Sequence, residues 1–569
     1  MAAIITNKLR IFNAQEFLQS INRSAASWTQ SNSYSAGNSV VNNQNLFICI
    51  SDHTSAASGT GPTPSELSDG GSVRWVHQGL SVYNNLYMAI GKNTAWLNDA
   101  NPPTPEDSIG YGYSVKANQI AMKKVNGSDM TLAIPRINWK SGTVYTMYEH
   151  DTPEEIIPNS YVITEGNNQF NVYKCINNML YTNDTDTIVQ VPSTVKPTTT
   201  STTNMETTSD GYIWKYMYSI ALSKSLKFLT KDYIPIDTIM YDPNAGGSTA
   251  EDIQWAVQTA AGGPSATIGK IKHVKILPNE TGGAVSGGIG YLPNILRSGF
   301  TFDGTTTISI PNIENTTNQA YKGYHLINTS SNPMQQFVIT NWSVSGTTAT
   351  ATLNGTISAA SAQSFIIAPG ITISGNGTGF KAYGIVQNGG SSGKISSFKI
   401  TDEGANWTNV DNATVSTEDL PALSGANPNV NAVKVKPIIS PEKGHGFDAV
   451  EEMGGYYIMI AMKLEYDEQS TRLNSAASPV STTKVVFPVS GTQSVFRQIA
   501  ILADPLEKTT LDPSTEESYR GPKHPDFGTA DETTFDVETG SGKVLYTENR
   551  QPVSRAIDQI EDIKVVFEF

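Results

Sequence analysis

The most constraining feature of the sequence is an alternation of apolar and polar side chains over residues 563–569. Successive side chains of a strand point to opposite faces, so a period of two separates Lys564 and Glu568 from the apolar positions. The apolar positions are Ile563, Val565, Phe567 and Phe569. A helical period would mix these side chains, so the pattern predicts a strand with one buried face.

A second alternating segment covers residues 210–220 and is rich in aromatic side chains. Its alternate positions are Tyr212, Trp214, Tyr216 and Tyr218. The period again predicts a strand. Tyrosine and tryptophan suit both protein cores and protein interfaces, so this face is either packed inside the core, the commoner case, or a contact stripe for a partner.

The composition extends the prediction of β-structure to the whole chain. The 569 residues are too many for one ordinary domain and predict three or four. Charged residues make up only 16%, and Gly, Ser, Thr and Asn are abundant, which favours strands joined by many turns. The expected fold is mainly β and multidomain, with few short helices.

Charge and targeting signals exclude several classes of protein. The net charge is −14 and no run of Lys or Arg occurs, so we expect no nucleic-acid partner. No apolar stretch is long enough to cross a bilayer, and the first residues lack a secretory signal. Cys49 and Cys175 are too far apart for a metal motif, which favours a reducing compartment and synthesis in a cytoplasm.

One helix is predicted near the start of the sequence. Asn13 can cap it and Glu16 occupies the return position of a capping box. Phe17, Leu18 and Ile21 then fall on one face at helical spacing. We interpret it as a small helix packed on the core.

Residues 22–78 form a predicted small β-module, with a hairpin over 39–50. Trp28, Tyr34 and Trp75 flank this hairpin. This pattern of rings resembles the small chitin-binding-type modules, in which exposed rings stack on sugars, so these residues are candidates for glycan or partner contact. The alternative, which we favour, is that the rings form the core of the module itself, because small modules need aromatic bulk.

The predicted organisation is a discontinuous β-rich core with two insertions. Composition assigns residues 1–21, 79–243 and 441–569 to the core. Residues 22–78 and 244–440 are the expected insertions, and the second is a Gly/Ser/Thr-rich module of β-sandwich type. Insertions of this kind cost little, because the entropy of closing a loop grows slowly with its length.

A weak internal repeat lies within the second expected insertion. Gly269–Ile276 is echoed by Gly393–Ile400, and each copy is followed by a glycine-containing turn and an aromatic residue, Tyr291 or Trp407. Two copies are too few for a solenoid. They predict duplicated hairpins in one or two β-sandwiches.

Two local motifs are candidates for catalytic or metal sites. Gly389–Gly393 fits the nucleophile-elbow pattern but lies in a Gly/Ser-rich linker rather than between a strand and a helix. His445 lies near three acids, and one histidine without a second ligand site is a weak metal signal. These acids, expected to be solvated on a short helix, are Asp448, Glu451 and Glu452. The sequence predicts no catalytic, cofactor-binding or metal site, and no cofactor.

Several core segments, taken in order, resemble one family, the baseplate wedge subunit of T-even-type contractile-tailed bacteriophages that pairs as a dimer in each wedge. The resemblance covers about half of the chain and excludes 22–78 and 244–440. The matching segments are Ile5–Arg10, Leu86–Gly91 with Trp96, Ile134–Trp139, Asp210–Tyr216, Arg497–Glu507, Tyr546–Pro552 and Asp558–Phe569.

The resemblance implies a non-enzymatic, mainly β, homodimeric component of a virion tail baseplate, assembled in the host cytoplasm. It would bind other wedge proteins, with tail fibre proteins as a further hypothesis, and hold the baseplate before contraction. An alternative from the Ser/Thr/Gly-rich modules and the aromatic trio is a glycan-binding tail adhesin or fibre-like protein.

Overall fold

The computed structural model divides the chain into two compact units. Unit 1 contains 1–136, 221–247 and 453–569, and unit 2 contains 137–220 and 248–452. Residues 137–220 thus group with most of the expected second insertion. The described residues are 5–21, 26–43, 45–69, 73–80, 86–152, 160–178, 181–182, 188–189, 191–243, 247–262, 269–277, 288, 290–387, 393–415, 433–465, 495–505, 541–554 and 560–569. Within them the fold is mainly β, as predicted.

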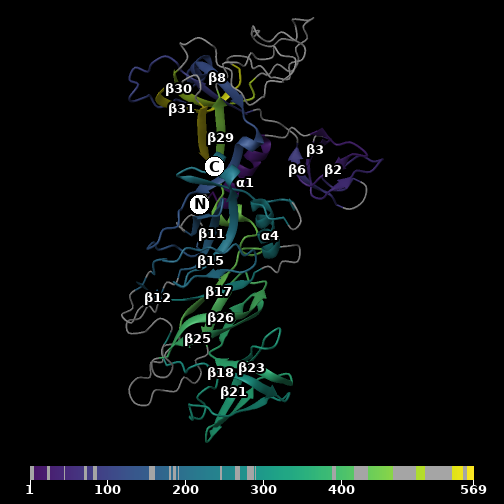
Figure 1. Cartoon of the computed structure of the whole chain (residues 1–569), viewed down its shortest axis with the longest axis vertical. Helices are drawn as coiled ribbons and strands as arrows, with labels where there is room; N and C mark the ends of the chain where they lie inside the picture. The colour runs from purple at the N-terminus through teal and green to yellow at the C-terminus, as the bar shows by residue number, and fades with distance from the viewer. Residues whose placement is uncertain are drawn as a thin grey trace. The chain divides into compact units, whose positions relative to one another are not determined.

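The first sheet of unit 1 has the order β31-β30-β7-β8 (Figure 1). Its strands are β7 (Leu86–Gly91), β8 (Gln119–Lys124), β30 (Val495–Ala503) and β31 (Lys543–Ser554). Every residue of β7 is buried. β30 is antiparallel to both neighbours, so a segment from late in the sequence lies at the centre of a sheet that begins near residue 86.

The second sheet of unit 1 has the order β16-β9-β29-β32. Its strands are β9 (Met130–Pro135), β16 (Tyr233–Ile236), β29 (Tyr457–Glu465) and β32 (Ile560–Glu568). β32 pairs with β29 along its whole length, and Ile563 and Val565 are buried. The strand predicted from the alternation at residues 563–569 is therefore confirmed.

The described residues of unit 1 form three α-helices, which are α1 (Asn7–Ser20), α2 (Ile109–Ala117) and α3 (Leu222–Phe228). The predicted start of the first helix was wrong. Thr6, not Asn13, is the N-cap, and its hydroxyl accepts a hydrogen bond from the backbone N–H of Leu9. α1 packs on β9 and β29 of the second sheet, and the rings of Phe17 and Phe569 lie 5.3 Å apart. A short 3₁₀ turn, η1 (Gly127–Asp129), precedes β9.

The small module of unit 1 contains a sheet of order β1-β3-β4-β6 and a separate pair, β2-β5. The strands are β1 (Ala26–Ser27), β2 (Ser33–Tyr34), β3 (Ser39–Asn42), β4 (Asn45–Cys49), β5 (His53–Thr54) and β6 (Trp75–Leu80). β3 and β4 form the predicted antiparallel hairpin. Asn43 in its turn has φ of 48°, a conformation that asparagine tolerates better than most residues.

Unit 2 begins with a sheet of order β10-β11-β15-β14 and a small pair, β12-β13. The elements are β10 (Tyr161–Gly166), β11 (Gln169–Asn177), β12 (Tyr181–Thr182), β13 (Ile188–Val189), β14 (Glu206–Thr207) and β15 (Ile213–Ala221). The helix α4 (Ala250–Gly262) contributes Val257 to the same apolar cluster as Trp214. β15 is the strand predicted from its aromatic alternation.

The Gly/Ser/Thr-rich part of unit 2 is built from separate antiparallel sheets. A six-stranded sheet has the order β18-β23-β20-β21-β22-β19, and β24-β27 and β25-β26 are pairs. Their bounds are β18 (Ile295–Phe302), β19 (Thr307–Ile310), β20 (His325–Asn328), β21 (Gln335–Ser345), β22 (Thr348–Leu353), β23 (Ala360–Ala368), β24 (Ile371–Gly375), β25 (Thr378–Gln387), β26 (Lys394–Ala405) and β27 (Val410–Val415). One apolar cluster, which includes Trp342 and Phe365, joins the large sheet to the pairs.

The entry and exit of this region lie side by side. β17 (Ile271–Ile276) and β28 (Val435–Ile439) form an antiparallel pair. Just beyond the pair, the backbone N–H of Leu277 donates to the carbonyl oxygen of Lys434 at 2.9 Å. The chain therefore leaves and returns through one two-stranded ladder. A short helix, α5 (Ala449–Met453), follows.

Candidate functional site

The three aromatic residues proposed for glycan or partner contact surround the interior of the small module. Trp75 is fully buried and Tyr34 is 6% exposed, while Trp28 is half-buried against the same cluster. The Tyr34 and Trp75 rings meet edge to face with centroids 5.1 Å apart. In this conformation only Trp28 offers ring surface to a ligand, so the hypothesis of glycan contact depends on that residue and stays a prediction.

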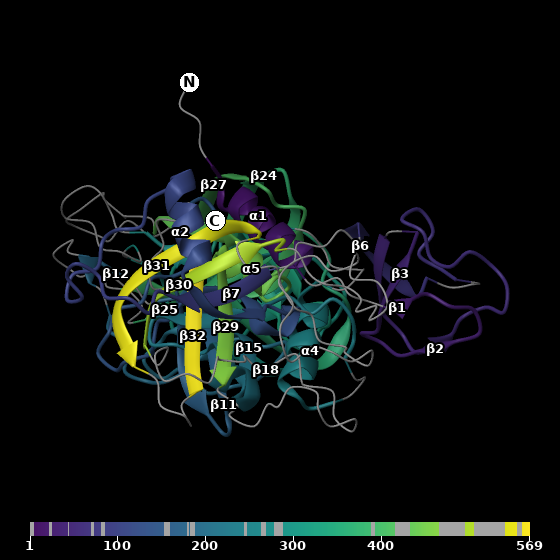
Figure 2. The same cartoon turned by 90° about the horizontal axis from the view of Figure 1, so that it is seen from above.

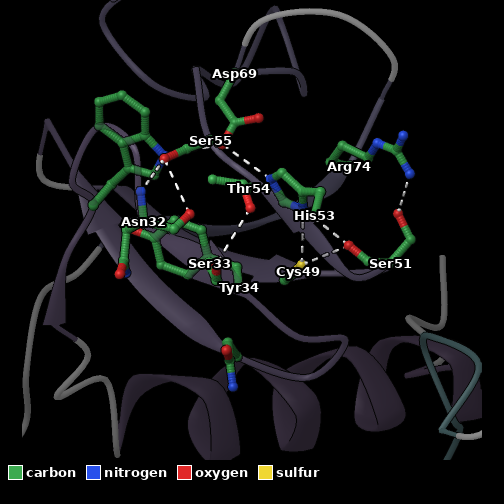
Figure 3. A network of polar contacts seen from close by, with 12 residues as sticks. Asn32, Ser33, Tyr34, Cys49, Ser51, His53, Thr54, Ser55, Asp69 and Arg74 are labelled. Atoms are coloured by element: carbon green, nitrogen blue, oxygen red, sulfur yellow. Dashed lines mark hydrogen bonds and ion pairs between the residues drawn. The ribbon is translucent and has the colours of Figure 1, made fainter. Parts of the chain in front are cut away.

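A polar network lies beside these rings and is shown in Figure 3. His53 Nε2 lies 3.1 Å from Asp69 Oδ2, and His53 Nδ1 lies 2.9 Å from the carbonyl oxygen of Ser51. The indole N–H of Trp28 donates to the same carboxylate oxygen at 3.0 Å. Burial alone would raise the pKa of Asp69, but the hydrogen bonds from His53 and Trp28 outweigh it and lower this pKa. The network fastens the loop before β6 to β5 and to Trp28.

Cys49 lies at the end of a row of contacts that runs from Asp69 through His53 to the thiol, since its Sγ lies 3.5 Å from His53 Nδ1. Such a row can activate a thiol only if the thiolate forms and a substrate reaches it. Cys49 is fully buried, and its burial raises the pKa of the thiol. Its S–H donates to the carbonyl oxygen of Ser51 at 3.1 Å. The arrangement is therefore that of a structural thiol.

The cluster around His445 is buried, contrary to part of the prediction. Glu452 was expected to be solvated but is 6% exposed, because Lys174 of β11 reaches it. Lys174 Nζ lies 3.6 Å from Glu452 Oε2, and His445 Nδ1 lies 3.0 Å from the same oxygen. Asp448 and Glu451 are partly exposed.

Charge pairing and burial shift the pKa values of Glu452 and His445. Burial by itself would raise the pKa of Glu452, but the Lys174 charge and the hydrogen bond from His445 outweigh it and lower this pKa. Burial lowers the pKa of His445, which favours the neutral ring. Lys174 Nζ also lies 4.7 Å from the centre of the Tyr148 ring. All these contacts hold α5 and the preceding turn against β11.

The aromatic stripe of β15 is internal. Tyr212, Trp214 and Tyr216 are each fully buried and belong to one cluster with Tyr145 and Tyr173. The stripe is therefore a packed sheet face rather than an exposed contact surface. Gly389–Gly393 lies, apart from its last residue, outside the described residues. In the described part of the chain, no three His, Cys, Asp or Glu side chains gather as metal ligands.

The excursion between β7 and β8, residues 92–118, is a surface segment that several hydrogen bonds fix to β30 and β31. Arg497 of β30 donates two hydrogen bonds to Asp99, from Nε to Oδ1 and from Nη2 to Oδ2, each 2.8 Å long. Its Nη1 donates to the carbonyl oxygen of Asn93 at 2.6 Å. The bonds from Arg497 lower the pKa of Asp99. Arg497 therefore fixes the first part of the excursion to the sheet.

Side chains of β31 fix the rest of the excursion. Asn549 donates to the carbonyl oxygen of Pro103 at 2.8 Å, and its Oδ1 accepts hydrogen bonds from Tyr111 and Gln498. Gln551 donates to the carbonyl oxygen of Ala100 at 3.0 Å. The segments Arg497–Glu507 and Tyr546–Pro552, which carried the family resemblance, contain Gln498, Asn549 and Gln551.

The excursion exposes large apolar side chains although it is firmly bonded. Leu97 is fully exposed, and Ile109 and Tyr113 of α2 are 83% and 65% exposed. Figure 2 shows α2 beside β30 and β31, where its opposite side packs with Val115. No local pattern marks Asp99 as an anchor, because its partner follows about four hundred residues later. Arg497 belongs to a segment that carries the family resemblance, but no pattern singles out this residue.

Comparison with known proteins identifies the same region. Residues 463–569 match the family model described as Bacteriophage T4, Gp8. The match contains β30, β31 and β32, which are strands of both large sheets of unit 1.

One relative extends this likeness. The baseplate wedge protein gp8 of Enterobacteria phage T4 is 23% identical over 190 residues, which cover 29% of this chain and 57% of that protein. The chain thus spans just over half the length of this relative. Together the two findings confirm the resemblance to baseplate wedge proteins of T4-like phages.

Proposed function

We propose that this chain is a structural subunit of the baseplate wedge of a T4-like contractile phage tail. In this role it dimerises, binds neighbouring wedge proteins and holds the baseplate together before contraction. The observation that carries the proposal is the family match over 463–569, because those residues supply central and terminal strands of unit 1 rather than a detachable segment. A match in the framework argues for shared architecture.

The geometry of the described residues is compatible with a structural role. The carboxylates of Asp69 and Glu452 are buried and accept hydrogen bonds from neighbouring residues, and Cys49 is a buried thiol. These groups stabilise loops and place no reactive atom at the surface. Among the described residues, no helix combines the length and hydrophobicity needed to cross a membrane.

The two regions outside the family resemblance have a separate role in the proposal. Residues 22–78 and 244–440 are insertions that decorate the baseplate and contact tail fibres or other wedge proteins. The paired strands β17 and β28 support this for most of the second region, because they bring its two ends together. Phages that lack residues 278–433 should then assemble baseplates but lose the added contacts. Normal, infectious particles from this deletion would contradict a needed role.

The proposal is tested by the position of the chain in the intact particle. Electron cryomicroscopy of extended tails should place the β29–β32 strands of this chain in the baseplate wedge, with two copies in contact in each wedge. A phage that lacks the chain should accumulate tails without complete baseplates, and supplying the full chain should restore them. Density for the chain in fibres, tube or head would refute the proposal.

A further inference from the structure

The outward face of α2 carries an apolar stripe that ends in a positive charge. Ile109, Tyr113 and Lys116 are spaced at i, i+4 and i+7, so they share one side of the helix. Ile109 is 83% exposed and Tyr113 is 65% exposed. Lys116 Nζ lies 4.7 Å from the centre of the Tyr113 ring. A surface helix normally turns charged side chains to solvent, and here none occurs between Asp107 and Lys116.

The charges at the two ends of this stripe are opposite. Glu106 and Asp107 are exposed just before Ser108, the N-cap of α2, and Lys116 lies in its last turn. If a second copy of the helix packs antiparallel to the first, the acids of each copy face Lys116 of the other. The two helix dipoles are then antiparallel, which is also favourable. The stripe is therefore self-complementary, as a two-fold interface requires.

The stripe is also held in position before any partner binds. The side chain of Ser108 accepts a hydrogen bond from the backbone N–H of Tyr111, and the Tyr111 hydroxyl donates to Asn549 at 2.9 Å. Lys116 Nζ donates to the carbonyl oxygen of Gly542 at 3.3 Å. A surface that is already ordered loses little conformational entropy on association.

We infer that α2 is the dimer contact, in which two copies pack their Ile109–Tyr113–Lys116 stripes antiparallel across a two-fold axis. This inference rests on the proposed dimerisation and names its surface.

The other two helices of unit 1 fit this role less well. α1 exposes Leu9 and Phe12, but charged residues interrupt its sequence and Arg10 is already paired with Glu568 at 3.1 Å. α3 exposes Leu222 and Leu226, but it carries lysines and no acid in its first turn. Two antiparallel copies of α3 would bring like charges together.

The first test compares three matched substitutions in the full chain by sedimentation equilibrium. The wild type is expected to be a dimer at micromolar concentrations, and Ile109→Asp should weaken it by about a hundredfold, because each copy buries a charge in the contact. Leu226→Asp on α3 and Phe12→Asp on α1 should leave the dimer intact. Circular dichroism spectra and melting temperatures like those of the wild type would show that the variants fold.

The second test exchanges the charges between two chains. Lys116→Glu alone and the double variant Glu106→Lys, Asp107→Lys alone should each dimerise about tenfold more weakly, because like charges then meet at both ends. An equimolar mixture of the two should form a heterodimer with about wild-type affinity. A misfolded variant would not show this rescue.

Three results would overturn the inference: a monomeric wild type, a dimer that survives Ile109→Asp, or a charge-exchanged pair that does not associate. A dimer that Phe12→Asp or Leu226→Asp dissociates instead would move the contact to that helix. None of these results changes where the chain lies in the particle, so the placement in the baseplate wedge is judged independently.

Discussion

The backbone N–H of Trp407 donates a hydrogen bond to the carbonyl oxygen of Gly269 at 3.1 Å. A corresponding hydrogen bond joins the N–H of Tyr291 to the carbonyl oxygen of Gly393, also at 3.1 Å. Gly269 and Gly393 begin the two copies of the sequence repeat, and Tyr291 and Trp407 are the aromatic residues that follow them. The glycine that begins each copy thus accepts a backbone hydrogen bond from the aromatic residue that follows the other copy. The two copies are therefore bonded to each other in a symmetrical way.

Gly269→Ala should destabilise the β17–β26 region strongly. Gly269 has φ of +65°, and a Cβ there would lie 2.2 Å from the carbonyl oxygen of Trp407. The left-handed conformation costs alanine about 1 kcal/mol and the clash adds more, so we expect a loss above about 2 kcal/mol. Amide hydrogen exchange of β17 and β26 measures the change.

Gly346→Ala is the matched control for that substitution. Gly346 has φ of +61°, but a Cβ there meets no atom within 4 Å. This variant should lose only the conformational cost, about 1 kcal/mol. Equal losses for the two variants would mean that the close approach of Trp407 is unimportant.

Arg497→Met should release the excursion between β7 and β8 without unfolding the sheet. The methionine keeps most of the apolar stem of Arg497 but loses the three hydrogen bonds to Asp99 and Asn93. Amide exchange over residues 93–103 should accelerate, while β7 and β30 stay protected. The control is Arg550→Met, whose pairing with Glu548 is weaker and more exposed. An unchanged excursion after loss of Arg497 would show that Asn549 and Gln551 suffice.

Lys174→Met should be among the most destabilising single substitutions of unit 2. Lys174 is 2% exposed, and its loss leaves the buried carboxylate of Glu452 without its cation. Breaking one side of a buried pair costs about 3–5 kcal/mol. The double variant Lys174→Met, Glu452→Gln should recover part of this loss. Lys270→Met is the control, because its pair with Glu403 is 37% exposed on each side and should cost less than about 1 kcal/mol.

Lys215→Met should stabilise unit 2 at neutral pH. Burial, reinforced by the charge of Lys272, lowers the pKa of Lys215 to about 8 from 10.5. The unfolded chain therefore binds this proton more tightly, and the folded chain gains stability as pH rises from about 8 to 10.5. At pH 7 removal of the buried charge should gain about 1–3 kcal/mol. Unfolding in urea between pH 7 and 10 should show a steeper pH dependence for the wild type than for the variant.

The strands were largely predictable, because their signal is local. The alternation over 563–569 predicted β32, and the alternation over 210–220 predicted β15. α2 was missed, since two glycines in Ile109–Ala117 oppose a helix and only its Ser108 cap and its packing against the sheet stabilise it. α4 was not predicted because segments rich in Gly, Ser and Thr flank it, and such a composition is typical of loops.

The polar sites could not be predicted to the same extent, because their partners are distant in sequence. Glu452 looked like a solvated acid since Lys174 lies on β11, far earlier in the chain. The same distance separates Asp99 from Arg497. Composition correctly suggested that the rings of the small module need burial, but it could not show that Trp75 is inside while Trp28 is half-buried.

The antiparallel ladder of β17 and β28 gives the Gly/Ser/Thr-rich region the geometry of a cassette. Its two ends emerge from neighbouring strands, as the ends of a hairpin turn do. The length of the chain between them therefore has little effect on the stability of unit 2. A different domain with adjacent termini could be grafted at Leu277 and Lys434 with the ladder unchanged. Related phages could then exchange this part of the molecule by recombination while the framework that carries it stays the same.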